Sequence, residues 1–285
     1  MPLLEALDGR PAIWFETRGD SSNRHVVLLH GFTGTHRTWD LLAERLSRSY
    51  FLILPDLPGH GRSGVSSKAA MGVGPTSDAI AAVVKLVEGG ASRKKIGVVG
   101  YSLGGRIALD LACRRQDLLG CLILEAASPG IERAHEREQR KAQDDELADD
   151  IERRGVGWFV DHWQETPIFS TQKELAPEAF QAIRRDRLSN SASGLAASLR
   201  AAGSGEMKPV WKSLPGLRLP VLLVAGKRDR KYVEAAETMR ARIAGSVLEE
   251  VQGAGHCVHL ERPAEFAEIV ERFLASRPEM LRAAG

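Results

Sequence analysis

The pentapeptide at residues 100–104 constrains the fold of this chain most. It reads Gly-Tyr-Ser-Leu-Gly, follows the short apolar run at 96–99 and precedes a helix-like segment over 105–114. This G-x-S-x-G order predicts a tight turn from strand to helix, in which side chains in place of the two glycines would collide. Ser102 would then stand exposed on the turn, beside the helix N-terminus and the amide of Leu103.

Further apolar runs indicate a parallel sheet. Besides 96–99, they lie at residues 26–29, 51–54, 122–124 and 221–224. Such runs are typical of strands buried on both faces, and helical patterns separate most of them. An Asp-Gly pair at positions 8 and 9 also predicts an antiparallel hairpin at the start of the chain. The predicted fold class is therefore α/β, with a mostly parallel sheet flanked by helices.

The middle of the chain differs from the rest in composition. Residues 128–209 hold charged and amphipathic helical stretches and no strand-like run. Aromatic side chains in this segment would let it pack onto the rest of the molecule. We therefore expect a helical cap, or lid, over the carboxyl edge of the sheet. It would be inserted between a first core part, residues 1–127, and a second, residues 210–285.

Composition limits the class of partner. The chain has 39 Lys and Arg against 37 Asp and Glu, and this balance argues against a nucleic-acid-binding surface. No apolar run approaches the ~20 residues of a membrane span, and the N-terminus has no secretory pattern. Three unpatterned cysteines fit a reducing compartment. We expect a cytoplasmic protein that binds a small molecule, with a monomer as the default oligomeric state.

Two further residues complete a predicted catalytic triad with Ser102. A serine hydroxyl needs an imidazole to take its proton, and the imidazole needs an orienting acid. Folds with the G-x-S-x-G turn place these in the order serine, acid, histidine. Asp229 follows the run at 221–224, and His256 lies in a glycine-rich loop after the strand-like residues 247–251. The spacing and order favour Ser102, Asp229 and His256 as the catalytic residues.

Each assignment has an alternative. Asp229 has basic neighbours and could be a surface ion-pair partner, while Glu125 is a second possible acid at the end of another strand. Cys257 and His259 beside His256 make a metal cluster conceivable, but no matching spacing of further ligands supports one. We therefore predict neither a metal nor a cofactor.

The loop after the first apolar run supplies the other half of an oxyanion hole. It reads His-Gly-Phe-Thr-Gly over residues 30–34, and the amides of Phe32 and Leu103 would stabilise negative charge on a substrate oxygen. We interpret His30 as structural, with its ring holding the loop. The Gly- and Pro-rich turn over residues 56–63 would set the shape of the neighbouring loops.

These motifs together resemble the α/β-hydrolase superfamily over almost the whole chain. The resemblance implies an α/β-hydrolase fold, which hosts esterases, thioesterases, carbon–carbon hydrolases, dehalogenases and lyases. A narrower resemblance is to the SHCHC synthases of menaquinone biosynthesis, which expel pyruvate from 2-succinyl-5-enolpyruvyl-6-hydroxy-3-cyclohexene-1-carboxylate. It rests on the motifs at residues 29–34 and 100–106, on Glu125 with 128–131, and on Trp163 with 167–169.

The narrower resemblance implies a small polycarboxylate substrate and a set of residues that bind it. These residues are Tyr101, Arg106, Arg140, Trp163 and Arg187. Arginines around the serine suit carboxylates, whereas an esterase for neutral substrates would favour an apolar pocket. Some relatives carry a second aromatic residue where this chain has Gln164. Two alternatives remain: a serine hydrolase for an ester, thioester or carbon–carbon bond, and a non-catalytic ligand receptor on the same fold.

Overall fold

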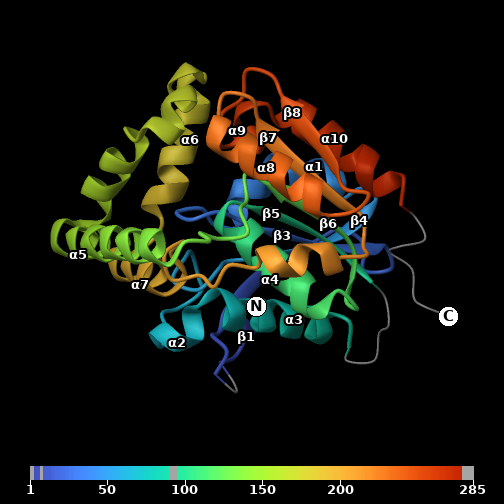
Figure 1. Cartoon of the computed structure of the whole chain (residues 1–285), viewed down its shortest axis with the longest axis horizontal. Helices are drawn as coiled ribbons and strands as arrows, with labels where there is room; N and C mark the ends of the chain where they lie inside the picture. Colours follow the sequence, from blue (N-terminus) through green and yellow to red (C-terminus); the bar gives the residue numbers. More distant parts are fainter. Residues whose placement is uncertain (1–2, 7–8, 90–94, 278–285) are drawn as a thin grey trace.

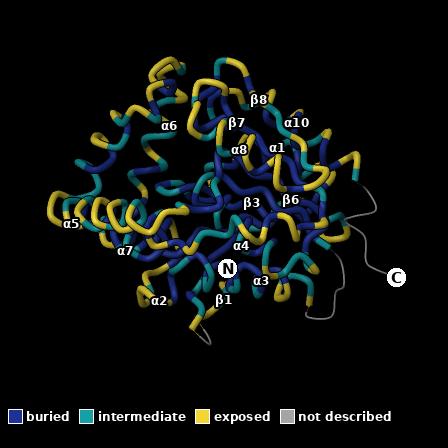
Figure 2. The backbone as a smooth tube through the Cα atoms, viewed as in Figure 1, coloured by how far each residue is buried: buried dark blue, intermediate teal, exposed yellow. Residues whose placement is uncertain are grey.

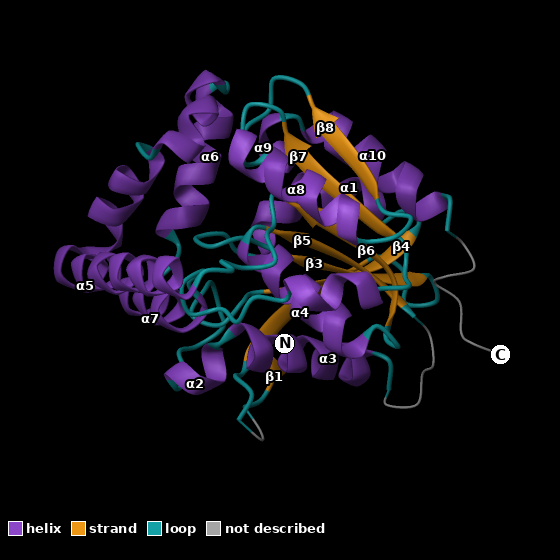
Figure 3. Cartoon of the chain, viewed as in Figure 1, coloured by secondary structure: helices purple, strands orange, loops and turns teal. Residues whose placement is uncertain are grey.

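The computed structural model describes residues 3–6, 9–89 and 95–277, in which an eight-stranded sheet lies between helices (Figures 1 and 3). Its spatial order is β1-β2-β4-β3-β5-β6-β7-β8. The bounds are β1 Leu3–Leu4, β2 Ile13–Arg18, β3 Arg24–Leu29, β4 Tyr50–Pro55, β5 Ile96–Tyr101, β6 Leu119–Glu125, β7 Val221–Gly226 and β8 Val247–Val251. Strands from β4 to β8 pair in parallel, which confirms the predicted α/β class.

The chain opens with antiparallel pairing, as the sequence predicts. Strand β1 pairs antiparallel with β2, and β2 pairs antiparallel with β4. Asp8, on which the hairpin prediction rested, lies outside the described residues. The sheet is therefore mostly parallel, with an antiparallel edge formed by the first two strands.

Alternate residues of the parallel strands build two cores, because successive side chains of a strand point to opposite faces. Val27 and Leu29 of β3 belong to the core with helices α3 (Val73–Val87), α4 (Leu103–Arg115) and α8 (Arg230–Arg242). Val26 and Leu28 belong to the core with α1 (Asp40–Leu46) and α10 (Pro263–Ala275). Figure 2 shows the central strands as the buried layer between these helices.

Three helices between β6 and β7 stand to one side of the sheet, at the left of Figure 1. We call α5 (Ala134–Gln164), α6 (Pro177–Leu188) and α7 (Ala192–Ala202) the cap helices. Helices α5 and α7 share a small apolar core, and α5 is interrupted at Gly155, whose φ is +85°. The predicted boundaries at residues 128 and 209 stay a prediction.

Short helices complete the described chain. They are η1 His36–Trp39, α2 Lys68–Met71, η2 Pro167–Glu174, η3 Trp211–Gly216 and α9 Val258–Glu261. Within the described residues, no helix combines the length and apolar character that crossing a membrane requires.

The strand order fixes where a ligand can bind. Strand β3 lies between β4 and β5, so the chain continues from β3 to one side of the sheet and later returns on the other. In such sheets, ligands bind in the crevice at the carboxyl ends of the strands around this reversal. Phe32 follows β3 and Ser102 follows β5, so both lie at that crevice.

Candidate active site

The turn between β5 and α4 holds Ser102 in a conformation that few residues adopt. Its φ is 50° and its ψ is −105°. A Cβ on Gly104 would lie 2.1 Å from the carbonyl oxygen of Leu29, and one on Gly100 would lie 2.6 Å from that of Gly104. Neither glycine can therefore carry a side chain unless the helix moves away from the sheet. The close packing supports the strained serine, as its sequence motif predicts.

Ser102, His256 and Asp229 form a continuous hydrogen-bonded chain. The Nε2 of His256 lies 3.2 Å from the Ser102 hydroxyl, and its Nδ1 lies 2.7 Å from an Asp229 carboxylate oxygen. Asp229 also accepts a hydrogen bond from the amide of Tyr232 at the start of α8. Because a carboxylate can only accept, Nδ1 carries the proton and Nε2 is left with a lone pair toward Ser102.

Glu125, the alternative acid, has a different partner. Both of its carboxylate oxygens lie 2.8 Å from Nδ1 of His259, and both residues are buried. This second acid–histidine pair packs behind Tyr101, whose ring lies 4.6 Å from that of His259. The structure thus brings Asp229, and not Glu125, to the imidazole beside the serine.

The side chains considered for a metal cluster point to separate partners. Cys257 lies 2.6 Å from the hydroxyl of Tyr101, and burial raises the pKa of its thiol. His256 contacts Ser102 and His259 contacts Glu125. In the described part of the chain, no group of three or more His, Cys, Asp or Glu side chains is arranged to hold a metal ion.

His30 holds the loop that carries Phe32. Its Nε2 accepts a hydrogen bond from the amide of Leu57, so its Nδ1 carries the proton and donates it to the Gly31 carbonyl. Burial lowers the pKa of His30, which keeps the ring neutral in this arrangement. The ring therefore joins the ends of β3 and β4 and has a structural contact with the loop, in line with the interpretation from the sequence.

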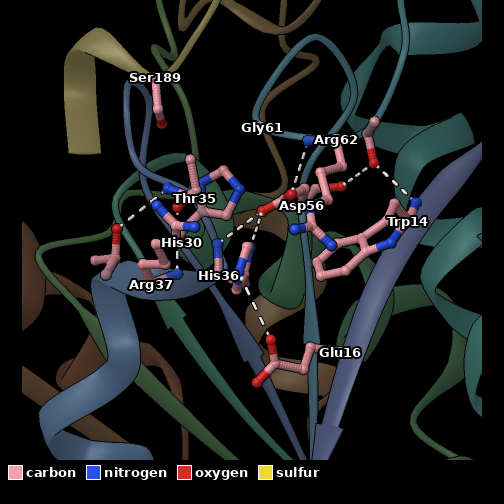
Figure 4. Close-up of polar contacts among 12 residues, drawn as sticks. Trp14, Glu16, His30, Thr35, His36, Arg37, Asp56, Gly61, Arg62 and Ser189 are labelled. Carbon is pink, nitrogen blue, oxygen red and sulfur yellow. Dashed lines mark hydrogen bonds and ion pairs between the residues drawn. The ribbon is translucent and has the colours of Figure 1, made fainter. Parts of the chain in front are cut away.

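Asp56 organises the neighbouring loops in the same way. Figure 4 shows its carboxylate between His36 and the turn at Arg62. It accepts hydrogen bonds from the amide and the ring of His36 and from the amide of Arg62. Gly61, with a φ of 50°, packs so closely on this carboxylate that a Cβ would lie 2.2 Å from it. The turn at residues 56–63 therefore sets the shape of the loops, as predicted.

The end of α6 is tied to the loop that carries Phe32, a connection that sequence reasoning missed. The side-chain Nδ2 of Asn190 donates to the carbonyl of Thr33 at 2.8 Å. Its Oδ1 accepts a hydrogen bond from the backbone N–H of Gly61 at 2.9 Å. Asp186 accepts hydrogen bonds from the amide and hydroxyl of Thr35. These contacts join residues 129 to 157 positions apart in the sequence, so no local pattern could have indicated them.

Ser102 and His256 open onto a cavity of about 480 Å³. It is lined by four of the five residues predicted to bind substrate, together with both predicted oxyanion residues: Phe32, Tyr101, Leu103, Arg106, Arg140 and Trp163. Arg106 donates to the carbonyl of Ala202 at 2.8 Å, and burial lowers its pKa. Arg140 pairs with Asp144 at 2.8 Å. The cavity thus combines a serine that is hydrogen-bonded to a histidine with arginines held by other contacts.

Arg187 is the predicted substrate residue that the structure does not bring into this cavity. It lines a neighbouring cavity of about 660 Å³, which shares Phe32, Tyr101 and Phe169 with the first. Arg187 is 5% exposed and donates to the side-chain oxygen of Gln172 at 3.0 Å. Its other terminal nitrogen, Nη1, is buried and has no hydrogen-bond partner among the described residues. Phe169, which lines both cavities, has its ring centre 4.8 Å from the guanidinium carbon of Arg187.

The structure also places Gln164 of the cap and Lys231 of α8. Gln164, the position where some relatives carry an aromatic residue, is 6% exposed and therefore turned inward. Lys231, on α8 two residues after Asp229, lines the cavity of Ser102, and no sequence pattern had pointed to it. No motif marks this lysine among the others of the chain, and only the fold brings it to this site.

A buried sheet with a serine on a strained strand-to-helix turn, followed by an acid and a histidine after later strands, defines the α/β hydrolases. The family model described as "Alpha/beta hydrolase family" matches residues 26–269. The chain is an enzyme of this superfamily.

Individual relatives are more specific. The chain is 36% identical over 260 residues to a Bacillus subtilis (strain 168) protein provisionally named 2-succinyl-6-hydroxy-2,4-cyclohexadiene-1-carboxylate (SHCHC) synthase, covering 90% of this chain and 93% of that one. It is 31% identical to the SHCHC synthase of Salmonella schwarzengrund (strain CVM19633), covering 87% and 93%. The solved structure of MenH from S. aureus superimposes with a TM-score of 0.87 at 32% identity, covering 93% and 98%. The chain belongs to the family of these SHCHC synthases, which confirms the resemblance seen in its motifs.

Proposed function

We propose that this enzyme is a lyase of menaquinone biosynthesis. It would convert 2-succinyl-5-enolpyruvyl-6-hydroxy-3-cyclohexene-1-carboxylate into SHCHC and pyruvate. The observation that carries the proposal is the cavity in which the hydroxyl of Ser102, 3.2 Å from His256, faces the cations of Arg106 and Arg140. A polycarboxylate substrate fits such a site, and relatives at 31–36% identity bear the name of this activity.

The proposed reaction uses the triad for proton transfer. His256, oriented by Asp229, withdraws the proton of Ser102. The serine oxygen then removes the ring proton at C2, beside the succinyl carbonyl. The electron pair forms the C2–C3 double bond, the C3–C4 double bond moves to C4–C5, and the bond from C5 to the enolpyruvyl oxygen breaks. The departing enolpyruvate takes up a proton at carbon to give pyruvate, so the reaction consumes no water.

The surrounding groups would stabilise and orient the reacting substrate. Negative charge that develops on the succinyl oxygen would be held by the amides of Phe32 and Leu103. Arg106 and Arg140 would fix carboxylates, while Tyr101 and Trp163 would line the ring. The role predicted for Arg187 requires a substrate that reaches into the second cavity, which shares Phe32, Tyr101 and Phe169 with the first. We propose that the reaction takes place in the cytoplasm.

Replacement of Ser102 by alanine tests the proposal. We expect pyruvate release, followed with coupled lactate dehydrogenase on freshly made substrate, to fall to the rate of the spontaneous elimination. Binding of the substrate should persist, because the cations that hold it are unchanged. Release by the unaltered enzyme no faster than the spontaneous rate would overturn the lyase assignment.

A serine hydrolase is the second candidate, since the same hydrogen-bonded chain also activates a serine for acyl transfer. The two candidates differ in the use of water and in a covalent intermediate. A burst of product from an activated ester, together with water consumed in the natural reaction, would favour the hydrolase. Pyruvate release without net water consumption would favour the lyase.

A further inference from the structure

Lys231 brings a third cation to the cavity of Ser102. It lies in the first turn of α8, and its side chain both lines the cavity and is exposed to solvent, so it stands at the rim. Its ammonium lies 5.8 Å from the centre of the Tyr232 ring. Among the described residues, no carboxylate lies within 4.0 Å of this ammonium. An ammonium without a partner carboxylate is available for an anionic ligand.

Among the described residues that line the cavity, no acidic side chain forms an ion pair with the Lys231 ammonium. Two glutamates, Glu132 and Glu136, line the same cavity, and Glu136 is engaged by Arg133 at 3.1 Å. Arg140 is paired with Asp144, whereas Arg106 bonds to a backbone carbonyl. The cavity therefore presents three cationic side chains, two of them without a carboxylate partner in the described chain, to whatever it binds.

This number matches the chemistry of the ligand. The substrate of the proposed function carries three carboxylates: one on the ring, one on the succinyl group and one on the enolpyruvyl group. We propose that Lys231 binds the third of these and determines, with Arg106 and Arg140, the selection of a tricarboxylate. The inference rests on the proposed function, and Arg187, which lines the neighbouring cavity, is compared with Lys231 in the test.

The chain offers a matched control for the test. Lys227 is an exposed lysine in the connection between β7 and α8, four residues before Lys231, and it does not line the cavity. We would compare Lys231→Met, Lys231→Arg, Lys227→Met and Arg187→Met. Methionine keeps the length of the side chain and removes its charge, while arginine keeps the charge.

The first readout is the steady-state rate of pyruvate release. Lys231→Met should raise KM roughly ten-fold with kcat within about two-fold, because the lost contact holds the substrate equally before and during the reaction. Lys231→Arg should restore KM, and Lys227→Met should leave it unchanged. Raising the salt concentration should reduce the difference in KM between Lys231→Met and the unaltered enzyme, because salt screens a charge at the rim. An unchanged KM in Lys231→Met, or a rise found only in Arg187→Met, overturns the inference and leaves the proposed function standing.

The second readout does not depend on the reaction. Binding of propane-1,2,3-tricarboxylate by calorimetry should weaken roughly ten-fold in Lys231→Met and stay unchanged in Lys227→Met. If the unaltered enzyme released no pyruvate, this result would still support a tricarboxylate site while the proposed function failed. Equal binding by both variants, or no binding by the unaltered enzyme, would overturn the inference.

Discussion

At the scale of single residues, the structure separates two carboxylate–histidine pairs. Asp229 contacts His256, which is hydrogen-bonded to Ser102, whereas Glu125 contacts His259 in the core. The sequence favoured Asp229 but left Glu125 as an alternative, because both acids lie at or just beyond the carboxyl ends of neighbouring parallel strands. Substitutions in the two pairs should therefore have different effects, because one pair lies beside the cavity and the other is enclosed in the core.

Asp229→Asn should reduce the rate of pyruvate release and leave stability almost unchanged. An asparagine can donate a hydrogen bond to Nδ1 and so favour the wrong tautomer of His256, which in serine proteases costs about 10⁴ in kcat. The measurement is kcat beside the melting temperature. A variant that kept more than a tenth of the activity would contradict the assigned role of Asp229.

Glu125→Ala should lower the free energy of unfolding and leave the rate of pyruvate release almost unchanged. It leaves His259 buried without the partner of its Nδ1, and breaking a buried pair in this way costs about 3–5 kcal/mol. Urea unfolding should therefore show a lower midpoint, while kcat of the folded fraction stays close to that of the unaltered enzyme. A kcat loss as large as that of Asp229→Asn would indicate that Glu125 takes part in the reaction.

At the scale of elements, the fit of α4 against β3 decides whether the serine turn can form. Gly104→Ala would push a methyl group against the Leu29 carbonyl, so we expect a loss of several kcal/mol together with activity. Gly157→Ala in α5 is the matched control, because a Cβ there meets no atom within 4 Å and alanine favours helices by about 1 kcal/mol over glycine. Urea unfolding of both variants checks the expectation, and equal stabilities would contradict it.

The link between α6 and the Phe32 loop gives a second prediction at this scale. Asn190→Ala removes both hydrogen bonds to Thr33 and Gly61, which should loosen the loop. We expect kcat to fall about ten-fold with little change in KM, a smaller effect than the 10²–10³ for loss of an oxyanion donor itself. Ser189→Ala, at an exposed neighbouring residue, serves as the control. Equal kcat values for the two variants would show that Asn190 only stabilises the cap helices.

At the scale of the whole molecule, buried neutral histidines make folding depend on pH. Burial lowers the pKa of His60 to about 3, whereas an unfolded histidine titrates near 6.5. Between these values only the unfolded chain binds the proton, so stability is fully present above pH 6.5 and falls as the pH decreases toward 3. The contribution of His60 lost between pH 7 and pH 5 is about 2 kcal/mol.

Urea unfolding at pH 7 and pH 5 measures this loss. His60→Gln should flatten the dependence on pH, because glutamine does not titrate but can still accept a hydrogen bond from the Thr33 amide. A dependence as steep in the variant as in the unaltered protein would place the titrating group elsewhere, with His30 as the next residue to replace.

The sequence by itself determined the parallel sheet, the serine turn and the order of serine, acid and histidine. These follow from local patterns: apolar runs that suit strands buried on both faces, and glycines where Leu29 and Gly104 leave no room for a side chain. Only the tertiary structure decided that Glu125 contacts His259 and leaves His256 to Asp229, that Arg187 lines the neighbouring cavity, and that Lys231 lines the cavity of Ser102. Such outcomes depend on which distant elements pack together, and local sequence patterns do not encode these long-range contacts.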